Sequence, residues 1–246
     1  MDRLEGRNPV LECLQRGQRK VHRVWIDQGA KPDDRVSRIR ELAEAAGAKL
    51  HVVERQKLDR MAEGRVHNGV IAEVDPVPTW STAALLDVVY GRGEAPFVIL
   101  ADGLQYEHNL GAVLRTALGF GASGVVLPTR RGADPVSPVV QRVAMGAVEV
   151  VPIVRESLFV ALSELKRAAV PIIGADADGE PLGTVDLRGA VAIVLGEEGS
   201  GLSPKLREKC DRIVSIPLMG ELESLNVSVA AAILMYEKRR QDAAGG

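Results

Sequence analysis

The chain has 246 residues, of which 46% are hydrophobic, 26% charged and 3% aromatic, an ordinary composition for a globular protein. These values exclude a disordered chain, a collagen-like chain and a coiled-coil fibre, and no apolar run reaches the ~18 residues that would span a bilayer. Its 31 basic and 33 acidic residues give a net charge of −2, which excludes a uniformly basic nucleic-acid binder. The first residues lack the apolar core of a signal peptide, and the two cysteines form no disulfide framework, so we expect a cytoplasmic protein.

Residues 1–75 alternate helical and strand-like patterns, which predicts a small α/β unit. We expect one helix to begin after Asn8-Pro9 and a second to run from Val36 to Ala46, with strands over 21–26, 50–53 and 69–74. Residues 75–79 (DPVPT) hold two prolines and break the periodicity, which indicates a linker over 76–96.

A basic stretch distinguishes this first unit. Residues 1–75 carry 15 basic and 13 acidic side chains, whereas the remainder carries 16 and 20. The segment 16–23 holds Arg19, Lys20 and Arg23 and no acidic residue. Such a segment is either a solvated loop or a contact for the phosphate backbone of a nucleic acid, and charge alone leaves both open.

From Phe97 onward, short apolar strands alternate with helices. Strands are predicted over 97–101, 124–127, 151–154, 170–174, 190–195 and 212–216. Uninterrupted apolar strands with helical connections are typical of a parallel sheet that is covered on both faces. A closing helix is predicted from Ser224, as its N-cap, to about Arg240, and its small residues favour close packing against another helix or subunit. The predicted domains are therefore 1–75 and 97–246, joined by the linker 76–96.

Three polar segments follow strands in this second domain. The first, residues 102–117, leads into a helix and contains Asn109 and Arg115. Arg115 stands among apolar neighbours, so it either is buried against an anionic partner or lies on an exposed helix face. The second, residues 196–202 (GEEGSGL), is a glycine-rich loop at the carboxyl end of a strand, where α/β sheets bind ligands. Its two adjacent carboxylates favour a cationic or hydroxyl-bearing ligand over a phosphate.

The third polar segment, residues 216–230, contains Ser224 and Asn226 at the start of the closing helix. A literal GxGxxG at residues 119–124 ends a helix and precedes a strand, which is the reverse of the order that a dinucleotide-binding turn requires. A nicotinamide-dependent oxidoreductase is thereby disfavoured. The four histidines are scattered, so no metal site is expected.

Taken together, the three segments resemble the N-x-G-x-x-x-R, G-x-E-G-x-G and S-L-N-V-S-x-A motifs of the SpoU/TrmH family of RNA ribose 2'-O-methyltransferases. Residues 6–10 (GRNPV) and 67–72 (HNGVIA) resemble the N-terminal substrate domain of the branch that modifies a guanosine of 23S rRNA. One departure is visible, because Tyr106-Glu107 stands where the family usually has Asp-Pro. That loop approaches the substrate, so the departure bears on the RNA target more than on the chemistry.

The resemblance implies an α/β fold with two parts. These are a small N-terminal RNA-binding domain, similar to ribosomal proteins, and a C-terminal methyltransferase domain of the SPOUT type with a trefoil knot. It implies S-adenosylmethionine as the cofactor, RNA as the partner, a homodimer, and neither a metal nor a membrane. Arg19, Lys20 and Arg23 would then contact RNA.

The family motifs also imply a set of site residues. Those that would bind the cofactor are Leu195, Gly196, Ile216, Leu218, Leu225 and Asn226. Those that would serve catalysis are Arg115, Asn109, Glu198, Ser224 and Asn226. Because a guanidinium stays protonated, Arg115 would pair with a substrate phosphate and stabilise the developing alkoxide, while the phosphate or a water takes the proton. A tRNA methyltransferase, an antibiotic-resistance rRNA methyltransferase and a non-catalytic RNA-binding protein stay open as alternatives.

Overall fold

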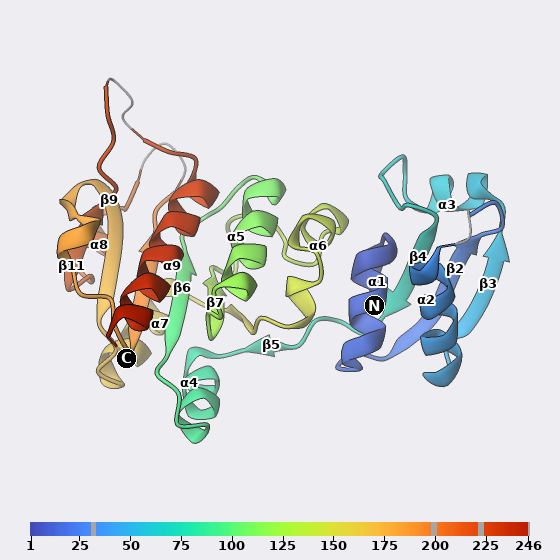
Figure 1. The fold of residues 1–246 in the computed structure, drawn as a ribbon, viewed down its shortest axis with the longest axis horizontal. Coiled ribbons are helices and arrows are strands. Elements are labelled where there is room, and N and C mark those ends of the chain that lie inside the picture. Colours follow the sequence, from blue (N-terminus) through green and yellow to red (C-terminus); the bar gives the residue numbers. More distant parts are fainter. Residues whose placement is uncertain (31–32, 198–200, 221–223, 246) are drawn as a thin grey trace. The chain divides into compact units, whose positions relative to one another are not determined.

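The computed structural model describes residues 1–30, 33–197, 201–220 and 224–245. The backbone contacts divide the chain into two compact units (Figure 1). Unit 1 comprises Met1–Val77 together with Asp134–Val150, and unit 2 comprises Pro78–Ala133 together with Val151–Gly246. The chain therefore passes three times between the units.

Unit 1 contains a mixed four-stranded sheet in the order β1-β4-β2-β3. The strands are β1 (Asp2–Glu5), β2 (Val21–Asp27), β3 (Lys49–Val53) and β4 (Val70–Val74). The helices are α1 (Arg7–Arg16), α2 (Asp34–Ala45), α3 (Arg55–Met61) and α6 (Pro138–Ala144), with a 3-10 turn η1 (Ala147–Glu149). One apolar cluster joins α1 and α2 to the sheet, and a second joins α3 to Trp25 and Ile71. The α/β unit predicted from residues 1–75 is thus confirmed, although β1 and α3 were not anticipated.

The two N-terminal segments that resemble the substrate domain lie against each other in unit 1. The Nε of Arg7 donates to the carbonyl oxygen of Asn68 at 2.9 Å, and the backbone N–H of Gly6 donates to the carbonyl of Val70 at 2.9 Å. His67 is buried, and its Nδ1 accepts from the backbone N–H of Gly69 at 3.0 Å. Segments more than 60 positions apart in the sequence therefore form one structural feature.

The predicted RNA contact is wrong for Arg19, because this side chain is buried inside unit 1. Its guanidinium makes two hydrogen bonds to the carboxylate of Glu149, including Nε to Oε2 at 2.9 Å, and one to Asp2 at 2.8 Å. Burial by itself would lower the pKa of Arg19, but the hydrogen bonds and the charge of Glu149 outweigh it and leave the pKa above its usual value. Lys20 and Arg23 are exposed, so their RNA contact stays a prediction.

Unit 2 is built on a seven-stranded parallel sheet in the order β11-β9-β10-β6-β7-β8-β5. The strands are β5 (Thr79–Trp80), β6 (Phe97–Ala101), β7 (Gly124–Leu127), β8 (Ile153–Arg155), β9 (Ile172–Pro181), β10 (Val191–Leu195) and β11 (Arg212–Ser215). The six predicted strands are confirmed, and β6 and β7 match residue for residue. Because all strands run in the same direction, their carboxyl ends meet at one edge.

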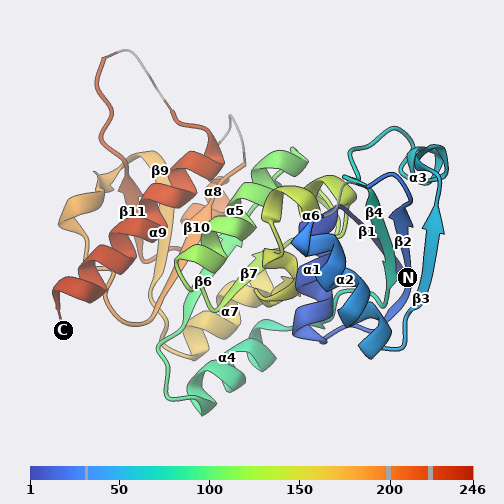
Figure 2. The ribbon, with the colours of Figure 1, turned by 45° about the vertical axis from the view of Figure 1, so that its right-hand side comes forward.

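Helices cover both faces of this sheet, as predicted. The helices of unit 2 are α4 (Thr82–Gly91), α5 (Glu107–Gly119), α7 (Leu158–Arg167), α8 (Pro204–Arg207) and α9 (Val227–Ala244), with a 3-10 turn η2 (Leu182–Thr184). The helices α4, α7 and α8 share a core with Val98 and Leu100 of β6. On the other face α5 and α9 lie side by side (Figures 1 and 2). There Arg239 of α9 donates to the carbonyls of Phe120 and Gly121, which directly follow α5, and so joins the two helices.

The start of α9 differs from the prediction. Its N-cap is Asn226 and not Ser224, since the Oδ1 of Asn226 accepts from the backbone N–H of Ser228 at 2.9 Å and from its hydroxyl at 2.6 Å. Asparagine and serine cap about equally well, so local chemistry could not choose between two candidates two residues apart.

The contact grouping also departs from the predicted domain limits in two places. Residues 78–96, predicted as a linker, contribute β5 and α4 to unit 2, because Leu85, Leu86 and Val89 belong to its core. Residues 134–150, predicted to lie in the second domain, pack in unit 1. The ion pair between Glu149 and Arg19 gives this grouping a physical cause. In the described part of the chain, no helix is both long and apolar enough to cross a membrane.

Candidate functional site

A pocket of about 570 Å³ lies at the carboxyl edge of the sheet in unit 2. Strands β9, β10 and β11 supply its floor, and the segment that leads into α9 supplies its wall. All six residues predicted to bind the cofactor line it: Leu195, Gly196, Ile216, Leu218, Leu225 and Asn226. The remaining lining residues are Ala175, Asp176, Ala177, Glu197, Gly201, Val214, Ser224, Val227 and Ala230.

The glycine at position 196 is required by a close approach of two backbone segments. A Cβ atom built on Gly196 would lie 2.3 Å from the carbonyl carbon of Gly201, a distance that real side chains do not tolerate. Glu197 and Gly201 exchange two backbone hydrogen bonds of 3.0 Å each, which close the loop over this contact. The backbone of Gly196 is therefore open to the pocket.

The pocket fits S-adenosylmethionine in size and in charge. Its volume lies within the range of ligand sites for small cofactors, roughly 300–1,000 Å³. Leucine and isoleucine side chains provide apolar walls for an adenosine, and Asp176 and Glu197 place carboxylates beside a ligand that carries a sulfonium and an ammonium group. Asp176 also supports the glycine loop, because its Oδ2 accepts from the backbone N–H of Leu202 at 3.2 Å.

Two of the predicted catalytic residues meet at the mouth of the pocket. The Nδ2 of Asn226 donates to the Oδ1 of Asn109 at 3.1 Å, although 117 residues separate them in the sequence. Asn226 therefore links the pocket wall to the first turn of α5. Ser224 also lines the pocket, and Glu198 lies outside the described residues.

Arg115 is exposed on α5, so the alternative of a buried arginine is wrong. The buried positions of α5 are Leu110, Gly111, Val113, Leu114 and Ala117. At 100° per residue, position 115 turns away from that face although its sequence neighbours are apolar. Arg115 has no hydrogen bond or ion pair within the ranges that the structure describes. Its guanidinium is therefore available to a group from outside the chain.

A second carboxylate, Asp102, lies at the same edge of the sheet. It follows β6, and its backbone N–H donates to the carbonyl of Leu195 at 3.0 Å. Burial raises the pKa of Asp102 above its usual value, the nearby Arg131 guanidinium lowers it, and the charge of Glu197 raises it. Neither Asp102 nor Asp176 was singled out from the sequence. The acidic run 176–180 directly follows an apolar strand, which is the signal that could have identified Asp176.

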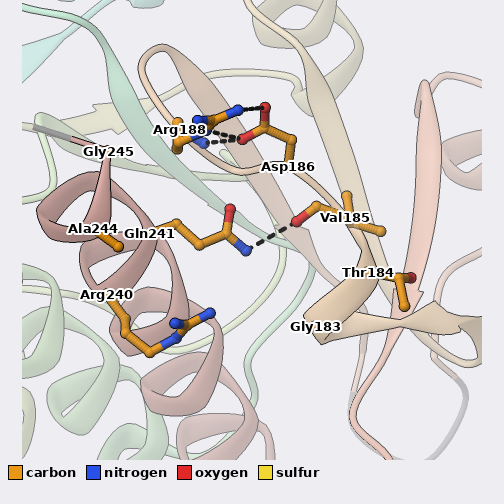
Figure 3. Close-up of a pocket in the computed structure, with 9 residues that line it drawn as sticks. All are labelled: Gly183, Thr184, Val185, Asp186, Arg188, Arg240, Gln241, Ala244 and Gly245. Carbon is orange, nitrogen blue, oxygen red and sulfur yellow. Dashed lines mark hydrogen bonds and ion pairs between the residues drawn. The ribbon is translucent and has the colours of Figure 1, made fainter.

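A second pocket, of about 340 Å³, lies near the end of α9 (Figure 3). There Asp186 accepts two hydrogen bonds from the Arg188 guanidinium, at 2.9 and 2.8 Å, and Gln241 donates to the carbonyl of Val185 at 2.9 Å. These groups satisfy one another; Val185, Asp186 and Arg188 precede β10, at the edge opposite the first pocket, and Gln241 lies on α9. The hydrogen bonds around the second pocket thus connect α9 to the segment before β10. We therefore take the larger pocket as the candidate functional site. No three His, Cys, Asp or Glu side chains gather as a metal ion would need in the described segments.

The fold and the site define an α/β protein whose ligand pocket opens at the carboxyl edge of a parallel sheet, beside a pair of asparagines and an exposed arginine. Two family models match this chain: "SpoU rRNA Methylase family" over residues 96–236, and "RNA 2'-O ribose methyltransferase substrate binding" over residues 3–80.

Individual proteins are similar over nearly the whole chain. The "Uncharacterized tRNA/rRNA methyltransferase slr0955" of Synechocystis is 39% identical over 98% of this chain and 63% of its own length. The "23S rRNA (guanosine-2'-O-)-methyltransferase RlmB" of Coxiella burnetii is 36% identical over 96% of this chain and 94% of its own length. The crystal structure of the SpoU methyltransferase AviRb from Streptomyces viridochromogenes, in complex with AdoMet, matches with a TM-score of 0.79 and 25% identity. That match covers 97% of this chain and 89% of the other.

The chain therefore belongs to the SpoU family of RNA 2'-O-ribose methyltransferases, with the substrate-binding domain of that family at its N-terminus. It is an enzyme whose cofactor is S-adenosylmethionine. The predicted family, fold class and cofactor are confirmed. The trefoil knot, the likeness of unit 1 to ribosomal proteins and the individual roles of the site residues stay predictions.

Proposed function

We propose that this enzyme methylates the ribose 2'-hydroxyl of a guanosine in 23S rRNA, in the cytoplasm. The observation that carries the proposal is the pocket whose wall residue Asn226 is joined to Asn109 on α5, because a cofactor bound in that pocket would lie beside the helix that carries Arg115. The guanosine target is supported by relatives named for that activity, which match more than nine-tenths of both chains. No residue that the structure describes in the site favours a tRNA target or a non-catalytic role.

Arg115 acts on the RNA in this proposal. When bound in the pocket, S-adenosylmethionine supplies an electrophilic methyl group. The Arg115 guanidinium pairs with a phosphate of the RNA and stabilises the alkoxide character that develops on the 2'-oxygen. Since guanidinium does not give up its proton, the phosphate or a water accepts the hydroxyl proton. Asn109 and Asn226 orient the ribose, and we assign the same role to Ser224 and Glu198.

We further propose that the active enzyme is a homodimer that pairs through α5 and α9. Leu118, Val229 and Tyr236 are exposed on these two helices, and Val229 and Tyr236 stand seven residues apart on α9. Arg115 and Leu118 stand three residues apart on α5 and so share a face. A second copy that binds there would bring the Arg115 of one copy close to the cofactor site of the other copy. Replacing Tyr236 by glutamate should then give monomers in analytical ultracentrifugation and reduce methylation.

Unit 1 supplies RNA affinity and target choice in this scheme, with Lys20 and Arg23 as its phosphate contacts. The decisive experiment maps 2'-O-methyl groups on cellular 23S rRNA and tRNA with and without the gene. The expected result is one 23S guanosine that loses its methyl group in the deletion strain and regains it when the gene is returned. A loss confined to tRNA would refute the proposed target.

A further inference from the structure

Charge changes sign along the carboxyl edge of the sheet in unit 2. Asp176 lies in β9 one residue beyond the part that pairs with β10, and Glu197 follows β10; together they make the cofactor half acidic. Beyond β6, the next two strands end in basic residues: Arg130 and Arg131 follow β7, and Arg155 ends β8. Because the strands are parallel neighbours in the order β10-β6-β7-β8, these arginines lie at the same edge as the cofactor pocket.

The loop that carries the two arginines is fixed by its backbone. The N–H of Ala133 donates to the carbonyl of Leu104 at 2.6 Å, and an Arg155 guanidinium nitrogen donates to the carbonyl of Thr129 at 3.4 Å. Gly132 has a φ of +91°, and a Cβ built on it would lie 2.9 Å from the oxygen of Leu104. A close backbone approach thus holds the loop against the segment that leads into α5.

The side chains of Arg130 and Arg131 nevertheless point their charge outward. Both residues are exposed, and neither has an ion pair or a hydrogen bond of its own within the described ranges. Asp102 interacts with Arg131 and is nearly buried at 6% exposure; burial raises its pKa, and the charge of the Arg131 guanidinium offsets part of that rise. Two adjacent unpaired arginines on a braced loop have the chemistry of a phosphate site, since guanidinium groups recognise phosphate by paired hydrogen bonds.

We propose that Arg130 and Arg131 bind the phosphate backbone of the RNA next to the nucleotide that is methylated. This inference rests on the proposed function for the identity of the RNA. The acidic cofactor half attracts the cationic methyl donor and repels phosphate, whereas the basic half attracts phosphate. The methyl donor and the RNA would therefore bind at different positions along the carboxyl edge of the sheet. Unit 1 then is not the sole source of RNA affinity, because unit 2 contributes contacts beside the reacting ribose.

The test measures RNA affinity against salt for the full chain and for the double variant Arg130→Ala/Arg131→Ala. A 23S rRNA transcript and a short oligouridine serve as RNA probes. Loss of two phosphate contacts should reduce the slope of log affinity against log salt by roughly 1.4–1.8, at 0.7–0.9 for each contact. The KM for the transcript should rise, while turnover at saturating RNA and the calorimetric affinity for S-adenosylmethionine stay unchanged.

Two controls make the result specific. Arg92→Ala removes another exposed arginine, before β6 at the opposite edge of the same sheet, and should leave the slope unchanged. The charge-retaining pair Arg130→Lys/Arg131→Lys should keep most of the slope. An unchanged slope in the alanine variant, an equal effect of Arg92→Ala, or a parallel loss of S-adenosylmethionine binding would overturn the inference. Oligouridine binding does not depend on which nucleotide is methylated, so a wrong 23S target would leave this test intact.

Discussion

The buried ion pair in unit 1 allows a test of whether Arg19 stabilises the fold or binds RNA. Arg19 and Glu149 are almost fully enclosed, with side-chain exposures of 1% and 3%. Replacing Arg19 by methionine would leave the Glu149 carboxylate buried without its partner. Removing one member of such a pair costs about 3–5 kcal/mol. In a domain of 60–100 residues this lowers the melting temperature by roughly 4–8 °C for each kcal/mol. Replacing both residues, with Glu149 changed to leucine, should restore most of the loss.

The cysteines allow the two units to be followed separately. Burial, and next the charge of Glu149, raise the pKa of the Cys13 thiol to about 12, so it should resist alkylation at neutral pH until unit 1 opens. Since each 1.4 kcal/mol is a factor of ten, Arg19→Met should accelerate Cys13 labelling by on the order of 10²–10³. Cys210 belongs to unit 2 and should keep its rate.

Mass spectrometry of the alkylated peptides gives both rates in one sample. Equal Cys13 labelling in the wild type and in Arg19→Met would refute the assignment of Arg19 as a structural residue. Arg23→Ala is the matched surface variant, because Arg23 is half exposed in its ion pair with Glu73. It should leave Cys13 protected and reduce only the salt dependence of RNA binding.

The catalytic unit offers three further predictions. Arg115→Ala should leave the calorimetric affinity for S-adenosylmethionine intact and lower the single-turnover rate by about 10²–10³, and a near-normal rate would show that the arginine does not act on the RNA. Gly196→Ala should weaken S-adenosylmethionine binding by more than about tenfold, because its Cβ meets the backbone of Gly201; unaltered binding would contradict the close approach. Asn226→Asp keeps the oxygen that caps α9 but opposes two oxygens at the contact with Asn109, so thermal melting should change little while methylation falls. Equal losses of stability and activity would show that Asn226 only caps α9 and has no separate role in methylation.

The sequence predicted most of the sheet in unit 2 because buried parallel strands are continuously apolar and therefore easy to recognise. It predicted the six cofactor residues through the family motifs, and the structure brings all six to one pocket. Their juxtaposition could not have been obtained from spacing, since Leu195 ends β10 and Leu225 precedes α9, and both line the pocket only in the folded chain.

Long-range pairing accounts for what sequence reasoning missed. Arg19 stood in a segment without acids, yet its partner Glu149 lies 130 residues further along the chain. Counting charges within a short segment cannot identify a partner so far along the chain. The contact grouping of residues 134–150 with unit 1 likewise depends on contacts between residues far apart in the sequence. For Arg115, by contrast, the sequence left burial and exposure both open for a local reason, because residues adjacent in sequence do not share a helix face.

The net charge of −2 also conceals the arrangement that matters for catalysis. Asp176 and Glu197 concentrate negative charge at the cofactor pocket, while the exposed arginines of unit 2 lie at neighbouring strand ends. A cationic methyl donor and an anionic RNA require opposite potentials within one active site, and a parallel sheet can provide both because adjacent strands end at a common edge. An enzyme for this reaction therefore needs an uneven charge distribution whatever its net charge, and fold topology supplies that distribution, which composition cannot reveal.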